Sequence, residues 1–534
     1  MEALEAVNAG IWSIAPPLIA IILALVTKEV ISSLLIGIFA GALIYSGGNP
    51  VEMVVTTFEV MGSKLGENAN ILIFLGLLGA LVVVVTRGGG SSAYGNWAVR
   101  KIKTRKGASL ATCALGCLIF IDDYFNCLTV GTVMRPVTDK HRISRAKLAY
   151  FLDATAAPIC IIAPVSSWGA SVASYMQDAG AENGMATFIS TIPYNLYALL
   201  TIIMVVILCV TKIQFGSMTK FEKNAIELGD LHTTSAEDVQ TEDLGTKEVS
   251  TKGKVYDLVI PILSLIIFTV LAMAYTGGFF AGECSFTESF GNCDSAQSLV
   301  LGSLAALVVT FLLYLPRKVL GFRTFMDSIT QGIKSMVPAF TILILAWTIG
   351  GICNVDYLNT GGFVGNWVNN SSFPVFILPV IIFIVAGFLG FSTGTSWGTM
   401  AILIPIGAAI CTTPETQTLL IPVLGAILAG AVYGDHISPI SDTTILSSTG
   451  AGCNHIDHVS TQLWYATVVA ACCVIGYLIM GITNSFIIPL VVSVALMAAA
   501  MLVLNRIYKK KYQIDYDKIK VEMKVNQPEE ISQS

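Results

Sequence analysis

Residues 434–444 read Gly-Asp-His-Ile-Ser-Pro-Ile-Ser-Asp-Thr-Thr and follow an uncharged, mostly apolar stretch at 419–432. That stretch is long enough to enter a bilayer, and the chain then presents two acids, a histidine and four hydroxyl side chains. A carboxylate at membrane depth costs about 2.5–3.5 kcal/mol or more, so it is rare without a functional reason. Pro439 has no backbone donor and disturbs the preceding turn, which frees carbonyl oxygens. The segment therefore predicts a broken membrane helix.

The oxygen atoms of such a broken helix suit a small cation, because carboxylates, hydroxyls and free carbonyls are hard ligands. No Lys or Arg occurs from 335 to 505, so Asp435 and Asp442 have no basic neighbour in their own half of the sequence. A buried carboxylate without a counter-charge must protonate, pair with a remote cation or bind a metal ion. Alternation between the protonated and the metal-bound state is what exchange of protons for cations requires. We expect Asp435 to be the acid that exchanges the proton.

The composition indicates a membrane protein throughout. The chain has 534 residues, of which 54% are hydrophobic and 12% charged, and its mean hydropathy is +0.74. That charged fraction is about half of what soluble proteins show, and many apolar runs reach the roughly 18 residues that can span a bilayer. Residues 1–10 are acidic and contain no basic region, so the first apolar segment is expected to be a retained span and not a cleaved signal peptide. The predicted fold class is an all-α polytopic membrane protein.

Apolar runs divide the chain into predicted spans and domains. The expected spans are 13–27, 30–46, 70–86, 148–173, 193–211, 257–276, 298–315, 335–353, 418–447, 461–482 and 484–505. The expected domains are an N-terminal membrane repeat (1–212), a cytoplasmic polar linker (213–255), a C-terminal inverted membrane repeat (256–483), an additional transmembrane helix (484–505) and a cytoplasmic tail (506–534). The linker shows no periodic apolar face, so a flexible connector is favoured over a regulatory element.

Two further apolar segments, 108–134 and 373–410, are predicted to be re-entrant hairpins. Lys and Arg cluster on both flanks of 108–134, and basic residues favour the cytoplasmic side. A single crossing would violate that rule, so the segment enters and leaves from the inside, with its tip near 120–126. Loops 174–192, 277–297 and 354–372 contain no Lys or Arg and are expected outside. The second hairpin then opens outward with its tip at 390–398, the N-terminus lies outside, and the tail lies in the cytoplasm.

The two halves share this layout. Asp123 precedes Ser167 by 44 residues, and Gly394 precedes Ile437 by 43. Each half offers a hairpin followed by a broken helix, which predicts an inverted repeat of the kind found in secondary transporters.

The sequence also resembles a known family. Residues 392–399, Ser-Thr-Gly-Thr-Ser-Trp-Gly-Thr, together with 434–444, resemble the signature of the NhaC family of Na+/H+ antiporters. That family is similar to a wider superfamily of two-repeat ion-coupled carriers with paired hairpins. The resemblance implies a multi-pass protein of the cell membrane that exchanges Na+ or Li+ against protons. It loosely covers most of the chain and is weakest in the first 60 residues, the linker and the tail.

Polar residues at the hairpin tips and broken helices form the candidate site. The residues expected to bind the cation or the proton are Asp123, Asn126, Ser166, Ser167, Thr393, Thr395, Ser396, Asp435, Ser438, Ser441 and Asp442. Within this set, Na+ is expected at Asp123, Asp435 and Asp442. The residues expected to couple protons are Asp122, Asp153 and His436.

Each assignment has an alternative. One of Asp435 and Asp442 could cap a half-helix, and His436 could be a hydrogen-bonded wall residue. The acids at the first tip could pair with the basic flanks, and Asp153 could form a salt bridge with Lys147 or Arg145. The Ser, Thr and Gly residues could serve close helix packing.

Other functions remain open on the same fold. Carriers similar to the family move carboxylates such as malate and lactate, and others resemble drug exporters, so an exchanger of a small organic substrate is the main alternative. An organic anion usually needs an Arg or a helix N-terminus, and 335–505 has no Arg. An intramembrane aspartyl protease would need Gly-x-Gly-Asp, where this chain has Val432-Tyr433-Gly434-Asp435, so no enzyme is expected. No cofactor and no nucleic acid are expected; a homodimer and a disulfide between Cys284 and Cys293 are left open.

Overall fold

The computed structural model describes residues 9–512 except 28–29, 233–248, 283–284, 287–288, 290–291, 355, 361–362, 364–373, 413 and 440. All regular structure in these residues is helical. Seven of the described helices are long and apolar enough to cross a membrane, and three sharply bent helix pairs raise that number to ten. The predicted class, an all-α polytopic membrane protein, is confirmed.

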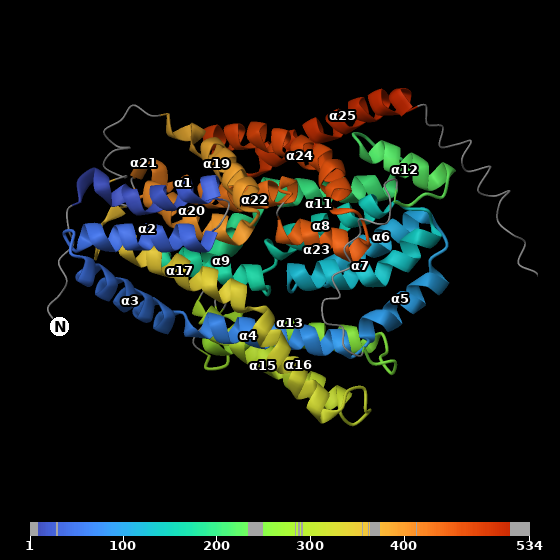
Figure 1. Ribbon diagram of the computed structural model, residues 1–534, viewed down its shortest axis with the longest axis horizontal. Helices are drawn as coiled ribbons and strands as arrows, with labels where there is room; N and C mark the ends of the chain where they lie inside the picture. The colour runs from blue at the N-terminus through green and yellow to red at the C-terminus, as the bar shows by residue number, and fades with distance from the viewer. Residues whose placement is uncertain are drawn as a thin grey trace, which may run out of the picture.

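Most of the long helices run along one direction of the molecule, as Figure 1 shows. The first half of the chain forms α1 (Ala15–Thr27), α2 (Val30–Tyr45), α3 (Pro50–Glu67), α4 (Ala69–Arg87), α5 (Gly90–Lys101), α6 (Arg105–Leu118), α7 (Asp123–Lys140), α8 (Arg145–Cys160), α9 (Ser167–Asp178), α10 (Gly184–Thr191), α11 (Leu196–Val210) and α12 (Met218–Glu227). The second half forms α13 (Tyr256–Thr276), α15 (Ser295–Tyr314), α16 (Phe322–Ser335), α17 (Val337–Cys353), α19 (Leu378–Thr393), α20 (Ser396–Ile410), α21 (Pro414–Gln417), α22 (Leu420–Ile437), α23 (Asp442–Ala451), α24 (His455–Thr483) and α25 (Ile487–Tyr512).

Both predicted hairpins are present. Helices α6 and α7 are joined by the short turn 119–122, and the Asn126 side chain closes it by donating to the carbonyl oxygens of Gly116 and Ile119 at 2.7 and 2.9 Å. Helices α19 and α20 are joined at Gly394, whose φ of +68° is a left-handed conformation that glycine adopts without steric cost. The first hairpin opens toward the end of the molecule with α5 and α12, and the second toward the opposite end, near α21 (Figure 1).

The two predicted broken helices are present as well. Helix α8 ends at Cys160 and α9 begins at Ser167, while α22 ends at Ile437 and α23 begins at Asp442. The halves interlock, because the second helix of each hairpin packs on the second segment of the other half's broken helix: α7 on α23, and α20 on α9. At the α7–α23 crossing, a Cβ added to Gly131 would lie 2.5 Å from the carbonyl carbon of Gly450, so this approach needs glycine.

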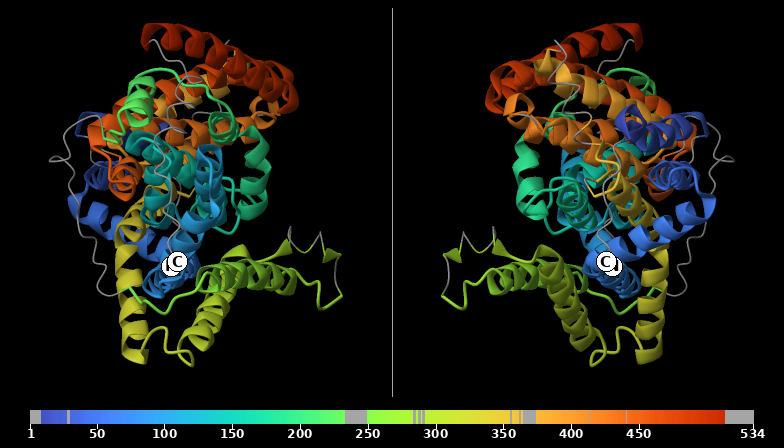
Figure 2. Two further views of the ribbon diagram at one scale, coloured as in Figure 1. Left: turned by 90° about the vertical axis from the view of Figure 1, so that its right-hand side faces the viewer. Right: turned by 90° about the vertical axis from the view of Figure 1, so that its left-hand side faces the viewer.

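A separate layer of helices lies beside this core. Helix α4 packs against α15 and α16, and α13 packs against α15. Figure 2 shows α13 and α15 reaching outward from the main body. Polar contacts join the helices of this layer. The Arg87 side chain donates to the Ser328 hydroxyl at 3.1 Å, and the Arg317 guanidinium donates to Oδ2 of Asp257 at 3.0 Å.

Several helices were not predicted. Helix α3 was not predicted because its acids and lysine interrupt the apolar residues, and α5, α10 and α16 were not predicted because they are short or polar. The prediction of a linker without an apolar face is wrong for α12, which buries Phe221 and Ala225 on one side. Residues 233–248 of that linker, the tail beyond 512 and Cys284 lie outside the described residues, and so does the proposed Cys284–Cys293 pairing. The division of the chain into domains stays a prediction.

Candidate functional site

The tips of the two hairpins and the first broken helix meet at a small cavity. Its volume is about 50 Å³, and among the described residues it is lined by Leu75, Asp122, Asp123, Tyr124, Ser167, Ser335, Met336, Ile342, Thr395 and Trp397. Three predicted cation ligands, from three separate elements, therefore share one cavity. Adjacent positions 122 and 123 both reach it because Asp122 lies in the turn and Asp123 is the first residue of α7. The cavity has two carboxylates, the hydroxyls of Tyr124, Ser167, Ser335 and Thr395, and no Lys or Arg among its described lining residues.

Asp122 and Asp123 have different environments in this cavity. The Ser167 hydroxyl donates to Oδ2 of Asp122 at 3.0 Å, which ties the hairpin tip to the start of α9. Asp123 is 1% exposed, and neither of its carboxylate oxygens has a hydrogen-bond partner among the described residues. A buried carboxylate without donors is costly unless a proton or a cation neutralises it. The geometry therefore gives Asp123 oxygens that can bind an exchanging ligand.

The second half repeats the contact between a hairpin tip and a broken helix. The Ser396 hydroxyl, one residue after Thr395, donates to Oδ2 of Asp435 at 2.8 Å. Asp435 is 2% exposed and lies in the last turn of α22. Trp168 and Trp397, which follow the serines of the two Ser-Trp-Gly sequences, pack together with ring centroids 5.3 Å apart. The two halves therefore meet at the level of the cavity.

The remaining predicted ligands mainly hold backbone in place. Ser166 caps α9 by accepting from the Gly169 N–H at 2.8 Å, and Ser441 caps α23 by accepting from the Thr444 N–H at 3.2 Å. Thr393 donates to the Leu389 carbonyl and Ser438 to the Phe391 carbonyl, and the Asn126 amide nitrogen donates within the first hairpin and to the Thr155 carbonyl of α8. Asp442 begins α23, and its side chain lies outside the described part of the structure. These contacts favour the structural alternatives for most of the hydroxyl groups.

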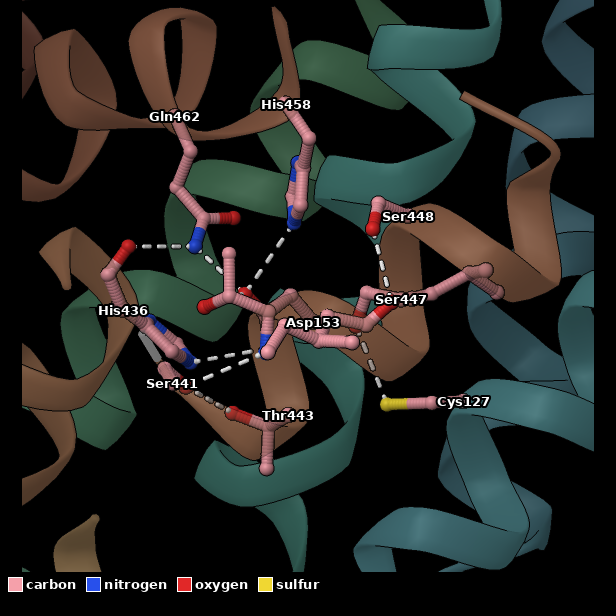
Figure 3. Close-up of polar contacts among 12 residues, drawn as sticks. Cys127, Asp153, His436, Ser441, Thr443, Ser447, Ser448, His458 and Gln462 are labelled. Atoms are coloured by element: carbon pink, nitrogen blue, oxygen red, sulfur yellow. Dashed lines mark hydrogen bonds and ion pairs between the residues drawn. The ribbon is translucent and has the colours of Figure 1, made fainter. Parts of the chain in front are cut away.

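A second buried cluster surrounds Asp153. Its Oδ2 lies 2.6 Å from the Gln462 amide nitrogen, 3.3 Å from His458 Nε2 and 3.2 Å from the Thr444 hydroxyl. His436 Nε2 lies 3.9 Å from the other oxygen, Oδ1. Figure 3 shows the two histidines and the glutamine converging on this carboxylate from α22 and α24. Three donors on one oxygen stabilise a negative charge in a buried place.

The alternatives raised for Asp153 and His436 can be compared with these contacts. Lys147 pairs instead with Glu222 at 3.1 Å, and Arg145 pairs with Asp139 at 2.7 Å, so neither neutralises Asp153. His436 Nδ1 contacts the Tyr197 hydroxyl at 3.0 Å, and the Gln462 amide donates to the His436 carbonyl at 2.7 Å. His436 is thus a hydrogen-bonded buried residue, and it also faces the carboxylate.

Three members of the Asp153 cluster were missed from the sequence: Thr444, His458 and Gln462. His458 and Gln462 are four residues apart on α24, so they lie on one face. That spacing alone could have marked a polar patch on an otherwise apolar helix. Their partner lies 305 and 309 residues away, which no local pattern reveals.

Of the three predicted Na+ ligands, the side chains of Asp123 and Asp435 are described and that of Asp442 is not, so their shared site stays a prediction. The described residues contain no group of three or more His, Cys, Asp or Glu side chains placed to hold a metal ion. Asp122 and Asp123 line the cavity at the first tip, while Asp435 approaches it through Ser396. A cation in this cavity would be bound by two carboxylates and neutral oxygens, which is a donor set typical of hard cations.

Comparisons with known proteins agree with this architecture. An uncharacterized protein of Haemophilus influenzae is 42% identical over 494 residues, which cover 90% of this chain and 92% of that protein. The malate-2H(+)/Na(+)-lactate antiporter of Bacillus subtilis is 28% identical over 197 residues, 31% of this chain and 38% of that protein. The crystal structure of the Alcanivorax borkumensis YdaH transporter is similar in fold, with a TM-score of 0.50 and 11% identity over 80% of this chain and 89% of that one.

A family model described as the Na+/H+ antiporter family matches residues 159–482. That range contains the second hairpin, both segments of the second broken helix and the start of α9 in the first. The family resemblance predicted from the two signature segments is thereby confirmed, and the chain is a transporter and not an enzyme: it belongs to the Na+/H+ antiporter family.

Proposed function

We propose that the protein is an antiporter that exchanges Na+, or Li+, for protons across the cell membrane. The observation that carries the proposal is Asp123, a buried carboxylate with no hydrogen-bond partner among the described residues, in a cavity shared with Asp122, Ser167 and Thr395. Such a carboxylate can be neutralised by a proton or by a cation, and the two ligands exclude each other. Mutual exclusion at one carboxylate gives exchange when the site opens to the two sides of the membrane in turn.

The size of the cavity supports a bare cation over an organic substrate. A cavity of about 50 Å³ has room for a partly hydrated ion, since about 10–15 Å³ of such space holds one water. Sites for organic ligands usually measure about 300–1,000 Å³. The described lining residues include no Lys or Arg that would pair with a carboxylate of malate or lactate. These features favour Na+ as the transported species at this place.

Asp153 and its two histidines supply a second group that can take part in proton movement. The cluster joins α8 of the first half to α22, α23 and α24 of the second half. The imidazoles of His436 and His458 both face the carboxylate of Asp153, so groups that can carry a proton surround it. We propose that this cluster couples proton movement to the positions of the two broken helices, with Asp435 beside it.

The proposed orientation places the N-terminus outside and the C-terminal tail in the cytoplasm of a cell membrane. It is supported by the basic flanks of the first hairpin and by two ion pairs of Glu222 in α12, one with Arg105 of that hairpin and one with Lys147 of α8, at one end of the molecule (Figure 1). The three loops without Lys or Arg follow α9, α13 and α17.

A flux assay with purified protein in proteoliposomes tests the function. An outward Na+ or Li+ gradient should drive proton movement that a pH-sensitive dye records, whereas gradients of malate, lactate or K+ should not. Proton movement driven by an organic acid and unaffected by Na+ would instead support the organic-substrate exchanger, for which the 28% identity to the malate–lactate carrier is the present support.

A further inference from the structure

A large polar cavity lies at one end of α9, away from the Asp123 cavity. Its volume is about 600 Å³, and we call it the vestibule. Its lining comes from the α3–α4 junction, from α9 and the loop that follows, from the start of α15 and the residues before it, and from Asn354. Most residues of the last three groups lie in the loops that contain no Lys or Arg and that the sequence places outside. Loops far apart in the sequence therefore surround one opening.

The charge of the vestibule suits a cation. Four acids and one lysine line it: Glu67, Asp178, Glu182, Asp294 and Lys64. The rest of its polar lining is mostly Asn, Gln and Ser, whose oxygens can accept the hydrogen bonds of a hydrated ion. A cavity lined by one sign of charge raises the local concentration of the opposite ion.

Helix α9 connects the vestibule to the Asp123 cavity. Its residues Ala170, Ala173, Ser174 and Gln177 line the vestibule, and Ser167 lines the inner cavity. These positions are three or four apart and share one helix face. On α4, Ile71 lines the vestibule and Leu75, one turn further, lines the inner cavity. About one helical turn, roughly 5 Å, therefore separates the two spaces.

That separating turn is apolar and tightly packed. Leu75 is fully buried and Ile71 is 5% exposed. Apolar side chains at a narrow place exclude a hydrated ion until they move apart. Movement of α9 relative to α4 would open or close this barrier.

An ion pair ties the vestibule end of α9 to α3. Lys64 Nζ lies 2.7 Å from Oδ1 of Asp178, the last residue of α9, and both side chains are mostly buried. Two glycines of α17 make room for the pair. A Cβ on Gly350 would lie 3.0 Å from Asp178 Oδ2, and one on Gly351 would lie 3.2 Å from Lys64 Cε. Three helices therefore meet at one charged contact.

From these observations, we infer that the vestibule is the outer entrance of the cation pathway, and that the Lys64–Asp178 pair is the latch that holds the turn of Ile71 and Leu75 closed. The identity of the ion and the side on which the entrance opens rest on the proposed function, but the latch does not. Breaking the pair should let α9 move and open the inner cavity to the vestibule. Restoring the pair in reverse should close it again.

Thiol labelling of whole cells tests the entrance. Single cysteines would replace Gln177 in the vestibule and Ser190, an exposed residue of α10 that does not line it, in a background with Cys284, Cys293 and Cys353 changed to serine. Two membrane-impermeant methanethiosulfonates of similar size, one cationic and one anionic, would be applied outside. We expect the ratio of cationic to anionic labelling rates to be about tenfold higher at position 177 than at 190. Equal ratios, or labelling of position 177 only from the inside, would overturn the entrance.

The latch is tested with a cysteine at Leu75, in the inner cavity. Lys64→Ala and Asp178→Asn should each raise the rate at which the cationic reagent labels this cysteine. The increase should be about tenfold if the ion pair stabilises the closed state by the free energy that corresponds to one pKa unit. The exchanged pair, Lys64→Asp with Asp178→Lys, should return the rate to its original value while elution and helicity stay unchanged. An unchanged rate in both single variants, or no return in the exchanged pair, would refute the latch. Labelling needs no transport, so a failure of Na+/H+ exchange would not produce these results.

Discussion

Replacement of Asp123 by asparagine is expected to remove Na+ binding while the protein still folds. An ion centred in a cavity of about 50 Å³ lies roughly 4 Å from its lining oxygens, where two unit charges interact by about 4 kcal/mol at an effective dielectric constant of about 20. Asparagine keeps the shape and one oxygen but removes this charge. The affinity for Na+ should therefore fall by about a thousandfold, since each 1.4 kcal/mol is about tenfold. Folding should be kept, because no described residue donates to Asp123.

Titration calorimetry of detergent-solubilised protein with NaCl, at mildly alkaline pH, measures this change. Asp139→Asn is the matched control, because Asp139 is an acid of the same helix that pairs with Arg145 outside the cavity. The control should keep its affinity. If the Asp123 variant bound Na+ as tightly as the parent and eluted as a folded protein, the cavity would not be the cation site.

Three further predictions concern protons, topology and stability. If protons and Na+ share Asp123, the apparent Na+ dissociation constant measured by calorimetry should rise up to about tenfold for each unit by which the pH falls. Asp153→Asn should slow proton flux in proteoliposomes but leave this pH dependence of Na+ binding unchanged. An apparent Na+ dissociation constant that does not change with pH would exclude a shared carboxylate. Cysteines replacing the exposed residues Lys103 and Lys140, at the two ends of the first hairpin, should label from the same, cytoplasmic side, and labelling from opposite sides would make it an ordinary span. Burial alone would raise the pKa of Glu222, but Arg105 and Lys147 lower it to about 2, so the stability that the charged carboxylate contributes is complete above about pH 4.5 and is lost as the pH falls toward 2. Glu222→Gln should therefore destabilise the protein at neutral pH by about 3 kcal/mol, which would lower its melting temperature, and the difference from the parent should be smaller at pH 3. An unchanged melting temperature at neutral pH would contradict this prediction.

The order of helices, hairpins and breaks could be predicted because it depends on local patterns. Runs of apolar residues predict spans, and basic residues on both flanks of 108–134 predict a hairpin in place of a single crossing. A proline among hydroxyls and acids marks the break before Asp442. These patterns act within one segment, so they predicted the two hairpins and the two broken helices. The short amphipathic helix α12 was missed although its period was present, with Met218, Phe221 and Ala225 on one side.

The pairing of side chains within the site could be predicted much less well. Ser167 and Asp122 were both candidates, yet their 3.0 Å contact joins elements 45 residues apart. The histidines that meet Asp153 come from the other half of the chain. Contacts of that kind depend on how the halves interlock, and an isolated sequence contains no period or spacing that specifies it. Several of the hydroxyl residues that were expected to bind the ion also cap helices, as Ser166 and Ser441 do, and their part in ion binding stays a prediction.

A continuous line of contacts connects the cavity that contains Asp123 with the carboxylate of Asp153. Thr395 lines the Asp123 cavity, and the next residue, Ser396, donates to Asp435. The Thr444 hydroxyl lies 3.5 Å from the Asp435 carbonyl and 3.2 Å from the carboxylate of Asp153. The two ends differ in chemistry, since Asp123 has no donor among the described residues and Asp153 has several.

This difference assigns separate tasks to the two groups. A carboxylate without donors gains most when a proton or a cation arrives, so Asp123 suits ligand exchange, whereas the donors around Asp153 fix the positions of α22, α23 and α24. Spatial contact alone does not show coupling. If binding at Asp123 moves the tip of α19–α20, however, Ser396 and Asp435 must follow, and Thr444 must then change its distance to Asp153. The coupling of ion exchange to helix movement would in that case depend on hydroxyl groups that bind no ion themselves.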